Sequence, residues 1–278
     1  MKRSFLYLFA FLCIQLFTAW LTAFVWYAVS GTEPSEALRL AVNGDGGSVN
    51  APLMITQTAV YGAVTMFVFI FFRWSAVSPA YLRTRQWGVF FWCAVAALGT
   101  IIPMLGLQQL VPLPDIARQS VTALIDDRFG YIALCIFAPL VEELVFRGAI
   151  LRSLLRAPYS PAIAITVSAI IFAAAHLNPA QMPHAFIIGL LLGWMYLRTG
   201  SILPGTAFHW VNNTIVYAWA VIAPYMQDMT LTEIFRGSTR NALLAVVFSL
   251  LILLPALYQL NRSMKKAEEV RRRTSRRR

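Results

Sequence analysis

The stretch PLVEELVFRG, residues 139–148, places two adjacent glutamates and an arginine inside a run of apolar residues. An ionisable side chain at membrane depth costs at least about 2.5–3.5 kcal/mol, so each one indicates a function or a buried partner. The whole chain of 278 residues is 59% hydrophobic and only 13% charged. This composition is typical of a membrane protein rather than a soluble domain.

Apolar segments recur along the whole chain. A helix of about 20 predominantly apolar residues spans the hydrocarbon core of a bilayer. We therefore predict an all-α fold, a polytopic membrane bundle of about eight transmembrane helices, of which the first is too long to be a signal peptide. The expected spans are residues 5–30, 53–72, 87–107, 131–155, 161–177, 184–197, 202–223 and 242–260.

The distribution of Lys and Arg predicts how the bundle is oriented. If both termini are cytoplasmic, the inner side collects most of the basic residues, while the outer loops hold five arginines and eight acidic residues. This asymmetry and an even number of spans agree with the positive-inside rule. We expect a multi-pass protein of a bacterial inner or plasma membrane, with an amphipathic helix at the outer interface within residues 115–128.

The net charge of +11 does not indicate nucleic-acid binding, because it is concentrated at one end. The tail NRSMKKAEEVRRRTSRRR, residues 261–278, contributes nine bases against two acids. A basic segment directly after a membrane helix is typical of a topology anchor that contacts anionic lipids. Cys13, Cys93 and Cys135 all lie in expected spans, so we predict neither disulfides nor a cysteine metal site.

Helical geometry separates the two glutamates of the opening stretch. Glu143 and Arg147 are four residues apart, share a helix face and can form an ion pair. Glu142 is turned by about 100° from Glu143 and about 140° from Arg147, so it can face an interior cavity and transfer a proton. From this stretch alone, one structural cluster of all three charges is an equally good interpretation.

Two further polar pairs lie on later spans. Phe172 and His176 are four residues apart in IFAAAHL, and His209 and Asn213 are four apart in FHWVNN. With Glu142 they supply a carboxylate, two imidazoles and an amide, which can activate a water and stabilise an oxyanion. His184 has no such partner, so we expect it to be structural and to face the outer interface.

These three motifs together resemble those of the CPBP family, the CAAX protease and bacteriocin-processing (Abi) intramembrane proteases, which include the type II CAAX prenyl endopeptidase. The resemblance covers about residues 132–217. It implies a catalytic core at 129–223, preceded by three helices in 1–128 and followed by the last helix and tail in 224–278. The matching residues are Glu142-Glu143-x3-Arg147, Phe172-x3-His176 and His209-x3-Asn213.

The resemblance implies a role for each matching residue. Glu142 and His176 would polarise a water for attack on a peptide carbonyl, and His209 and Asn213 would stabilise the oxyanion. Structural residues would orient this group: Glu143, Arg147 and Phe172. The substrate would be a membrane-associated protein or peptide, and nothing in the sequence indicates that it is prenylated.

Two alternatives remain open from the sequence. Zinc bound by Glu142, His176 and His209 is possible, but HExxH is absent, so we favour a mechanism that requires no cofactor. A proton-coupled transporter or a non-proteolytic scaffold would also bury such a cluster, although we find neither internal repeats nor broken helices. For Glu142 to lie level with His176, the fourth helix must continue through residues 150–155.

Overall fold

The computed structural model describes residues 2–44, 49–77, 79–227, 229–267 and 269. Within these ranges the regular structure is entirely helical, so the predicted all-α membrane bundle is confirmed. The elements, in chain order, are α1 (Lys2–Val29), α2 (Pro34–Asn43), α3 (Ala51–Phe71), α4 (Pro79–Leu82), α5 (Trp87–Leu110), α6 (Arg118–Asp126), η1 (Ile132–Phe137), α7 (Ala138–Glu142), η2 (Glu143–Leu151), α8 (Arg152–Leu154), α9 (Pro161–Ala175), η3 (Pro179–Gln181), α10 (Met182–Thr199), α11 (Leu203–Ile222), η4 (Pro224–Met226), α12 (Leu231–Ile234) and α13 (Thr239–Ser263).

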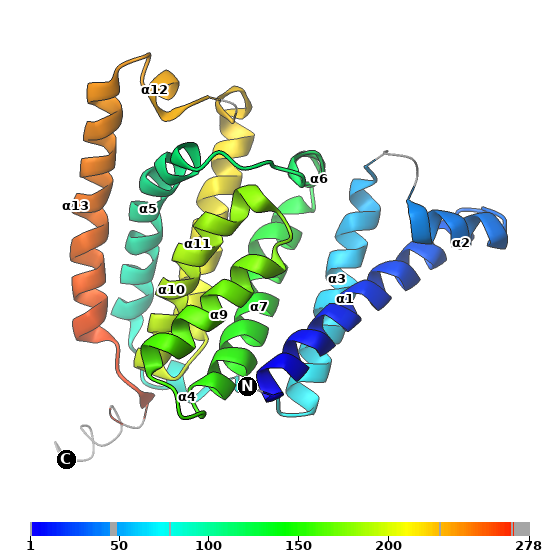
Figure 1. Cartoon of the computed structure of the whole chain (residues 1–278), viewed down its shortest axis with the longest axis horizontal. Helices are drawn as coiled ribbons and strands as arrows, with labels where there is room; N and C mark the ends of the chain where they lie inside the picture. Colours follow the sequence, from blue (N-terminus) through cyan, green and yellow to red (C-terminus); the bar gives the residue numbers. More distant parts are fainter. Residues whose placement is uncertain (1, 45–48, 78, 228, 268, 270–278) are drawn as a thin grey trace.

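The long helices run up and down between two ends of the bundle (Figure 1). The start of α1 and the end of α13 lie at the same end, whereas α2, α6 and α12 lie at the opposite end. Helices α5 and α13 pack at one side, α1 and α3 at the other, and the helices from η1 to α11 lie between them. This arrangement agrees with an even number of membrane crossings.

Each of the eight predicted spans coincides with a helix or a continuous helical run. Among the described residues, five helices are long and apolar enough to cross a membrane by themselves. The helical runs that carry the predicted catalytic residues are not among these five, so the count of eight stays a prediction. The sixth span is longer than expected and runs over Pro179–Thr199.

The interfacial helix expected within residues 115–128 is present as α6, where Leu124 is the buried residue. A second short amphipathic helix, α2, was not predicted. It lies in the polar loop between α1 and α3, where Ala37 is its buried residue. The basic tail is described only up to residue 267 and at 269, so most of the segment predicted to contact lipids lies outside the described residues.

The fourth helix continues unbroken from Ile132 to Leu154, through η1, α7, η2 and α8, as the depth argument requires. Its winding is different from the expected α-helix, because η1 and η2 are π-helical. Such wide turns are rare in proteins and occur often at functional sites. The glutamates Glu142 and Glu143 lie where α-helical winding changes to π-helical winding.

Serine side chains from the segment after α3 and from α9 donate hydrogen bonds to backbone carbonyls of this π-helical run. The Ser75 hydroxyl donates to the carbonyl of Leu144 over 2.7 Å, and the Ser168 hydroxyl donates to that of Phe146 over 3.3 Å. Because the hydrocarbon core of a bilayer offers no water to hydrogen-bond the backbone, such donors stabilise an irregular backbone there. All nine residues of η2 are buried, so this helix forms the centre of the bundle.

Small residues allow close helix contacts in the Gly189-x3-Gly193 pattern of α10. A Cβ atom at Gly189 would lie 3.1 Å from Ala169, and one at Gly193 would lie 2.9 Å from Ile165, so α10 packs tightly on α9. In the same way, a Cβ at Gly99 would lie 2.8 Å from the backbone nitrogen of Leu253. Glycine at 99 therefore sets the approach of α5 to α13.

We expect Gly99→Ala to destabilise the protein by about 1–3 kcal/mol, because the added methyl group meets backbone atoms that cannot move aside. The matched control is Gly88→Ala in the same helix, where a Cβ would meet nothing within 4 Å. Thermal unfolding in detergent, followed by tryptophan fluorescence, measures the difference. Equal midpoints for the two variants would contradict the close contact.

Candidate functional site

A buried ion pair joins the two charged residues that the sequence placed on one helix face. Nη1 of Arg147 donates to Oε1 of Glu143 over 2.9 Å, and both side chains are almost completely buried, at 1% and 0% exposure. Arg147 also approaches the carbonyl of Gly189 with Nη2 at 3.4 Å, and its guanidinium lies 4.2 Å above the Phe172 ring. The predicted pairing of Glu143 with Arg147 is thus present.

His209 on α11 contacts both glutamates, and its contact with Glu143 was not predicted. Its Nδ1 lies 3.3 Å from Oε1 of Glu143, and its Nε2 lies 3.7 Å from Oε2 of Glu142. Helical phase alone separated the two glutamates into different environments. The imidazole lies between them, so its two nitrogens reach one carboxylate each.

Glycine 205, one helical turn before His209, makes room for the buried carboxylate. A Cβ atom at Gly205 would lie 2.7 Å from Oε2 of Glu143. That oxygen has no hydrogen-bond partner among the described residues. The absence of a side chain at position 205 therefore lets α11 approach η2 closely enough for His209 to reach Glu143.

His176 lies at the C-terminal end of α9, where the next residue, Leu177, has a positive φ of 52°. This conformation is unfavourable for a branched side chain and is a kind of strain found near functional sites. The Nδ1 of His176 lies 2.9 Å from the Phe172 carbonyl. Because a carbonyl only accepts, Nδ1 is the donor, and Nε2 of a neutral ring keeps its lone pair.

Phe172 lies between the two imidazoles. Its ring centroid is 4.9 Å from that of His176 and 5.9 Å from that of His209, and both contacts are edge to face. The Arg147 guanidinium lies over the face of the same ring. The predicted orienting residue therefore contacts members of all three motifs.

Asn213 lies one helical turn after His209, and its amide bonds to the fourth helix. Nδ2 donates to the carbonyl of Leu134 over 3.0 Å, so the side chain links α11 to η1. A primary amide has two N–H groups, and one remains for another acceptor.

Two polar residues that sequence reasoning did not assign to the site lie within its electrostatic range. Tyr61 on α3 lies near the carboxylate of Glu142. His184 lies near the imidazoles of His176 and His209. Its Nε2 is buried without a hydrogen-bond partner among the described residues. Neither residue belongs to a spaced motif. The only signal for His184 was that it is an isolated polar side chain in an apolar span.

Comparison with known families bears on this arrangement directly. Residues 126–215 match the family model described as type II CAAX prenyl endopeptidase Rce1-like. The chain carries an Rce1-like CAAX protease domain. This confirms the family resemblance drawn from the three motifs, and the family supports a multi-pass membrane peptide hydrolase. No curated protein and no solved structure matches the chain significantly.

Glu142, His176 and His209 are the residues that could hold a zinc ion in the Rce1-like domain. Zinc ligands converge to about 2.0–2.2 Å from the ion. In the described part of the chain, no group of three or more His, Cys, Asp or Glu side chains is placed to hold a metal. Nδ1 of His176 faces a carbonyl and Nδ1 of His209 faces Glu143, so each ring could offer a metal only its Nε2. As they lie, Glu142, His176 and His209 do not fit a three-ligand site.

The buried ion pair of the Rce1-like domain yields a stability prediction. We expect Glu143→Gln and Arg147→Met each to cost about 3–5 kcal/mol, because each leaves the other charge buried and unpaired. The double variant should lose much less than the sum of the two. Thermal unfolding of all four proteins in detergent gives the coupling, and additive losses would contradict a direct pair.

Proposed function

We propose that the chain is an intramembrane endopeptidase of the CAAX protease type, which hydrolyses a peptide bond in a membrane-associated protein or peptide. The observation that carries this proposal is the contact of one imidazole, His209, with both glutamates of the first motif inside an Rce1-like domain. The proposed core is residues 129–223, between an N-terminal part, 1–128, and a C-terminal part, 224–278. Both termini are proposed to be cytoplasmic.

The exposure of the two glutamates supports different roles for them. The Glu142 side chain is 21% exposed, whereas that of Glu143 is 0% exposed. Glu142 can therefore meet water, and it lacks the short ion pair that holds Glu143 to Arg147. We assign Glu142 as the general base that takes a proton from the attacking water.

His176 would complete the activation of the water. Its Nδ1–H is held by the Phe172 carbonyl, which leaves Nε2 free to accept a hydrogen bond from water. The water oxygen then forms a bond to the substrate carbonyl carbon while its proton moves to Glu142. When the carbon–nitrogen bond breaks, Glu142 returns that proton to the leaving amine and is a carboxylate again.

His209 and Asn213 would stabilise the negative charge that develops on the carbonyl oxygen. Glu143 accepts from Nδ1–H of His209 and so directs Nε2 toward the Glu142 side. For Nε2 to donate to the carbonyl oxygen as well, the His209 ring must carry a proton on both nitrogens. Asn213 offers the N–H that its bond to Leu134 does not use. Preorganised donors of this kind contribute a large share of catalysis in acyl transfer.

We expect Glu142→Gln to lower peptide cleavage by about 10²–10⁴-fold, because the amide cannot take the proton. The matched control is Glu33→Gln, since the Glu33 side chain makes no cap hydrogen bond to α2. Native membranes that contain each variant are analysed by mass spectrometry for newly formed peptide termini. Termini that depend on Glu142 support the protease.

The same Glu142→Gln protein, purified from native membranes, should retain uncleaved peptides as a substrate trap. Recovery of a small solute in place of peptides would indicate a proton-coupled transporter. Identical termini and no trapped peptide would indicate a scaffold. Either outcome would overturn the proposed hydrolysis.

The choice of a mechanism without a cofactor has its own test. We expect chelator-treated enzyme, with zinc measured far below one ion per chain, to cleave a trapped substrate at the rate of untreated enzyme. The control is the same protein with zinc restored. Loss of activity that zinc restores would replace this mechanism with a metal-dependent one.

A further inference from the structure

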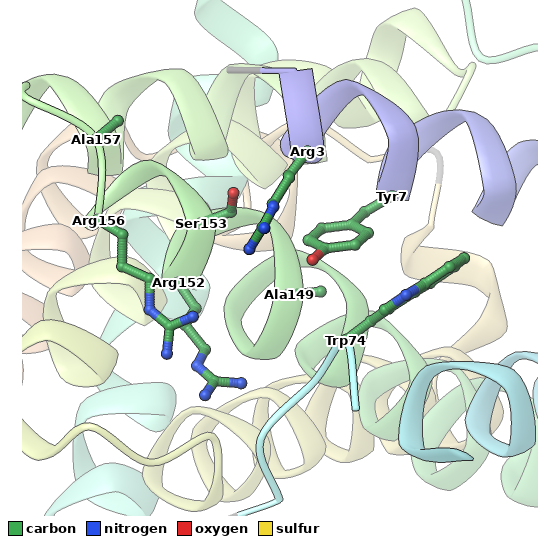
Figure 2. Close-up of a pocket in the computed structure, with 8 residues that line it drawn as sticks. All are labelled: Arg3, Tyr7, Trp74, Ala149, Arg152, Ser153, Arg156 and Ala157. Atoms are coloured by element: carbon green, nitrogen blue, oxygen red, sulfur yellow. The ribbon is translucent and has the colours of Figure 1, made fainter. Parts of the chain in front are cut away.

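A cavity of about 220 Å³ opens between the start of α1, the segment that follows α3, and the end of the fourth helix (Figure 2). It lies at the end of the bundle where α1 begins and α13 ends. Drug-sized ligands occupy pockets of roughly 300–1,000 Å³, so this cavity suits a smaller group. The side chains that matter here are those of Arg3, Tyr7, Trp74, Arg152, Ser153 and Arg156.

Three arginines give the cavity its charge. Arg3 comes from α1, Arg152 from α8, and Arg156 from the turn after it, and no acidic side chain lines the cavity. Within the described ranges, none of the three makes an ion pair with a carboxylate. Arg3 and Arg156 are exposed and Arg152 is half-buried, so the three guanidinium groups can be hydrated, but together they favour an anion in this space.

The hydrogen-bond donors that line the cavity suit a phosphate group. Guanidinium groups bind phosphate oxygens through paired N–H donors, and the Ser153 hydroxyl adds another donor. In Figure 2 the Arg3 side chain reaches from α1 into the space between Ser153 and Tyr7. An anion there would be bound from two helices that are far apart in sequence.

The remaining wall is aromatic and indicates where the anion comes from. The rings of Tyr7 and Trp74 are 5.3 Å apart, on the side of the cavity away from Arg156 (Figure 2). Tyr and Trp are enriched at the level of lipid headgroups. A phosphate held beside these rings, at the end of apolar helices, can remain attached to acyl chains that lie along α1 or α3.

We propose that this cavity binds the phosphate of an anionic phospholipid at the face of the membrane where the chain begins. The headgroup joins α1 to the fourth helix, which also carries Glu142 and Glu143. Among the residues that the structure describes, none that lines the cavity belongs to the basic tail. The binding does not depend on the proposed protease activity.

The test uses the full chain in nanodiscs of phosphatidylcholine with or without phosphatidylglycerol. Native mass spectrometry counts the phosphatidylglycerol retained, and thermal unfolding measures stabilisation. We expect one tightly retained phosphatidylglycerol, and at least a tenfold weaker retention for the double variant Arg152→Gln/Arg156→Gln. The single variant Arg3→Gln, on another helix, should weaken retention as well.

The matched control is Arg83→Gln/Arg85→Gln, which removes two charges from exposed arginines outside the cavity. We expect it to retain the lipid as the unchanged protein does. Equal losses for both double variants, or no retained lipid at all, would overturn the proposal. Stabilisation by inorganic phosphate to the same extent as by phosphatidylglycerol would also overturn it, in favour of a soluble anion.

Discussion

Glu143 and Arg147 are buried together in the interior of a membrane bundle, and neither charge is affordable there without the other. Their contacts extend beyond the pair. Arg147 reaches the backbone of α10 and the Phe172 ring of α9, and Glu143 reaches His209 of α11. One ion pair therefore fixes the relative positions of four helices, and the more exposed Glu142 is presented next to this fixed group.

The cost of the ion pair explains the small residues around it. Gly205 leaves space for a carboxylate oxygen, and Gly189 lets α10 approach closely enough for its carbonyl to face Arg147. A larger side chain at either position would separate a charge from its partner. The glycines of these helices are thus explained by electrostatics as much as by packing.

Hydropathy and charge were enough to predict the helical segments, the shared end of the two termini, and the pairing of Glu143 with Arg147. The three motifs were enough to find the family. The contact of His209 with Glu143 could not be predicted, because residue spacing describes one helix and says nothing of how another helix inserts a side chain. Tyr61 belongs to no motif, and its approach to Glu142 depends on the packing of α3 alone. The π-helical winding was missed because residues four apart share a face in both kinds of helix.

That winding also relates the two ends of the fourth helix to each other. A π-helical turn contains about one residue more than an α-helical turn. The same number of residues therefore rotates by a smaller angle about the helix axis. Glu142 precedes η2, and Arg152 follows it. If η2 were α-helical, Arg152 and Arg156 would point in a different direction relative to Glu142. The π-helical turns therefore set the angle between these two groups of side chains. One continuous helix can then direct its carboxylates to the centre of the bundle and its guanidinium groups to the side.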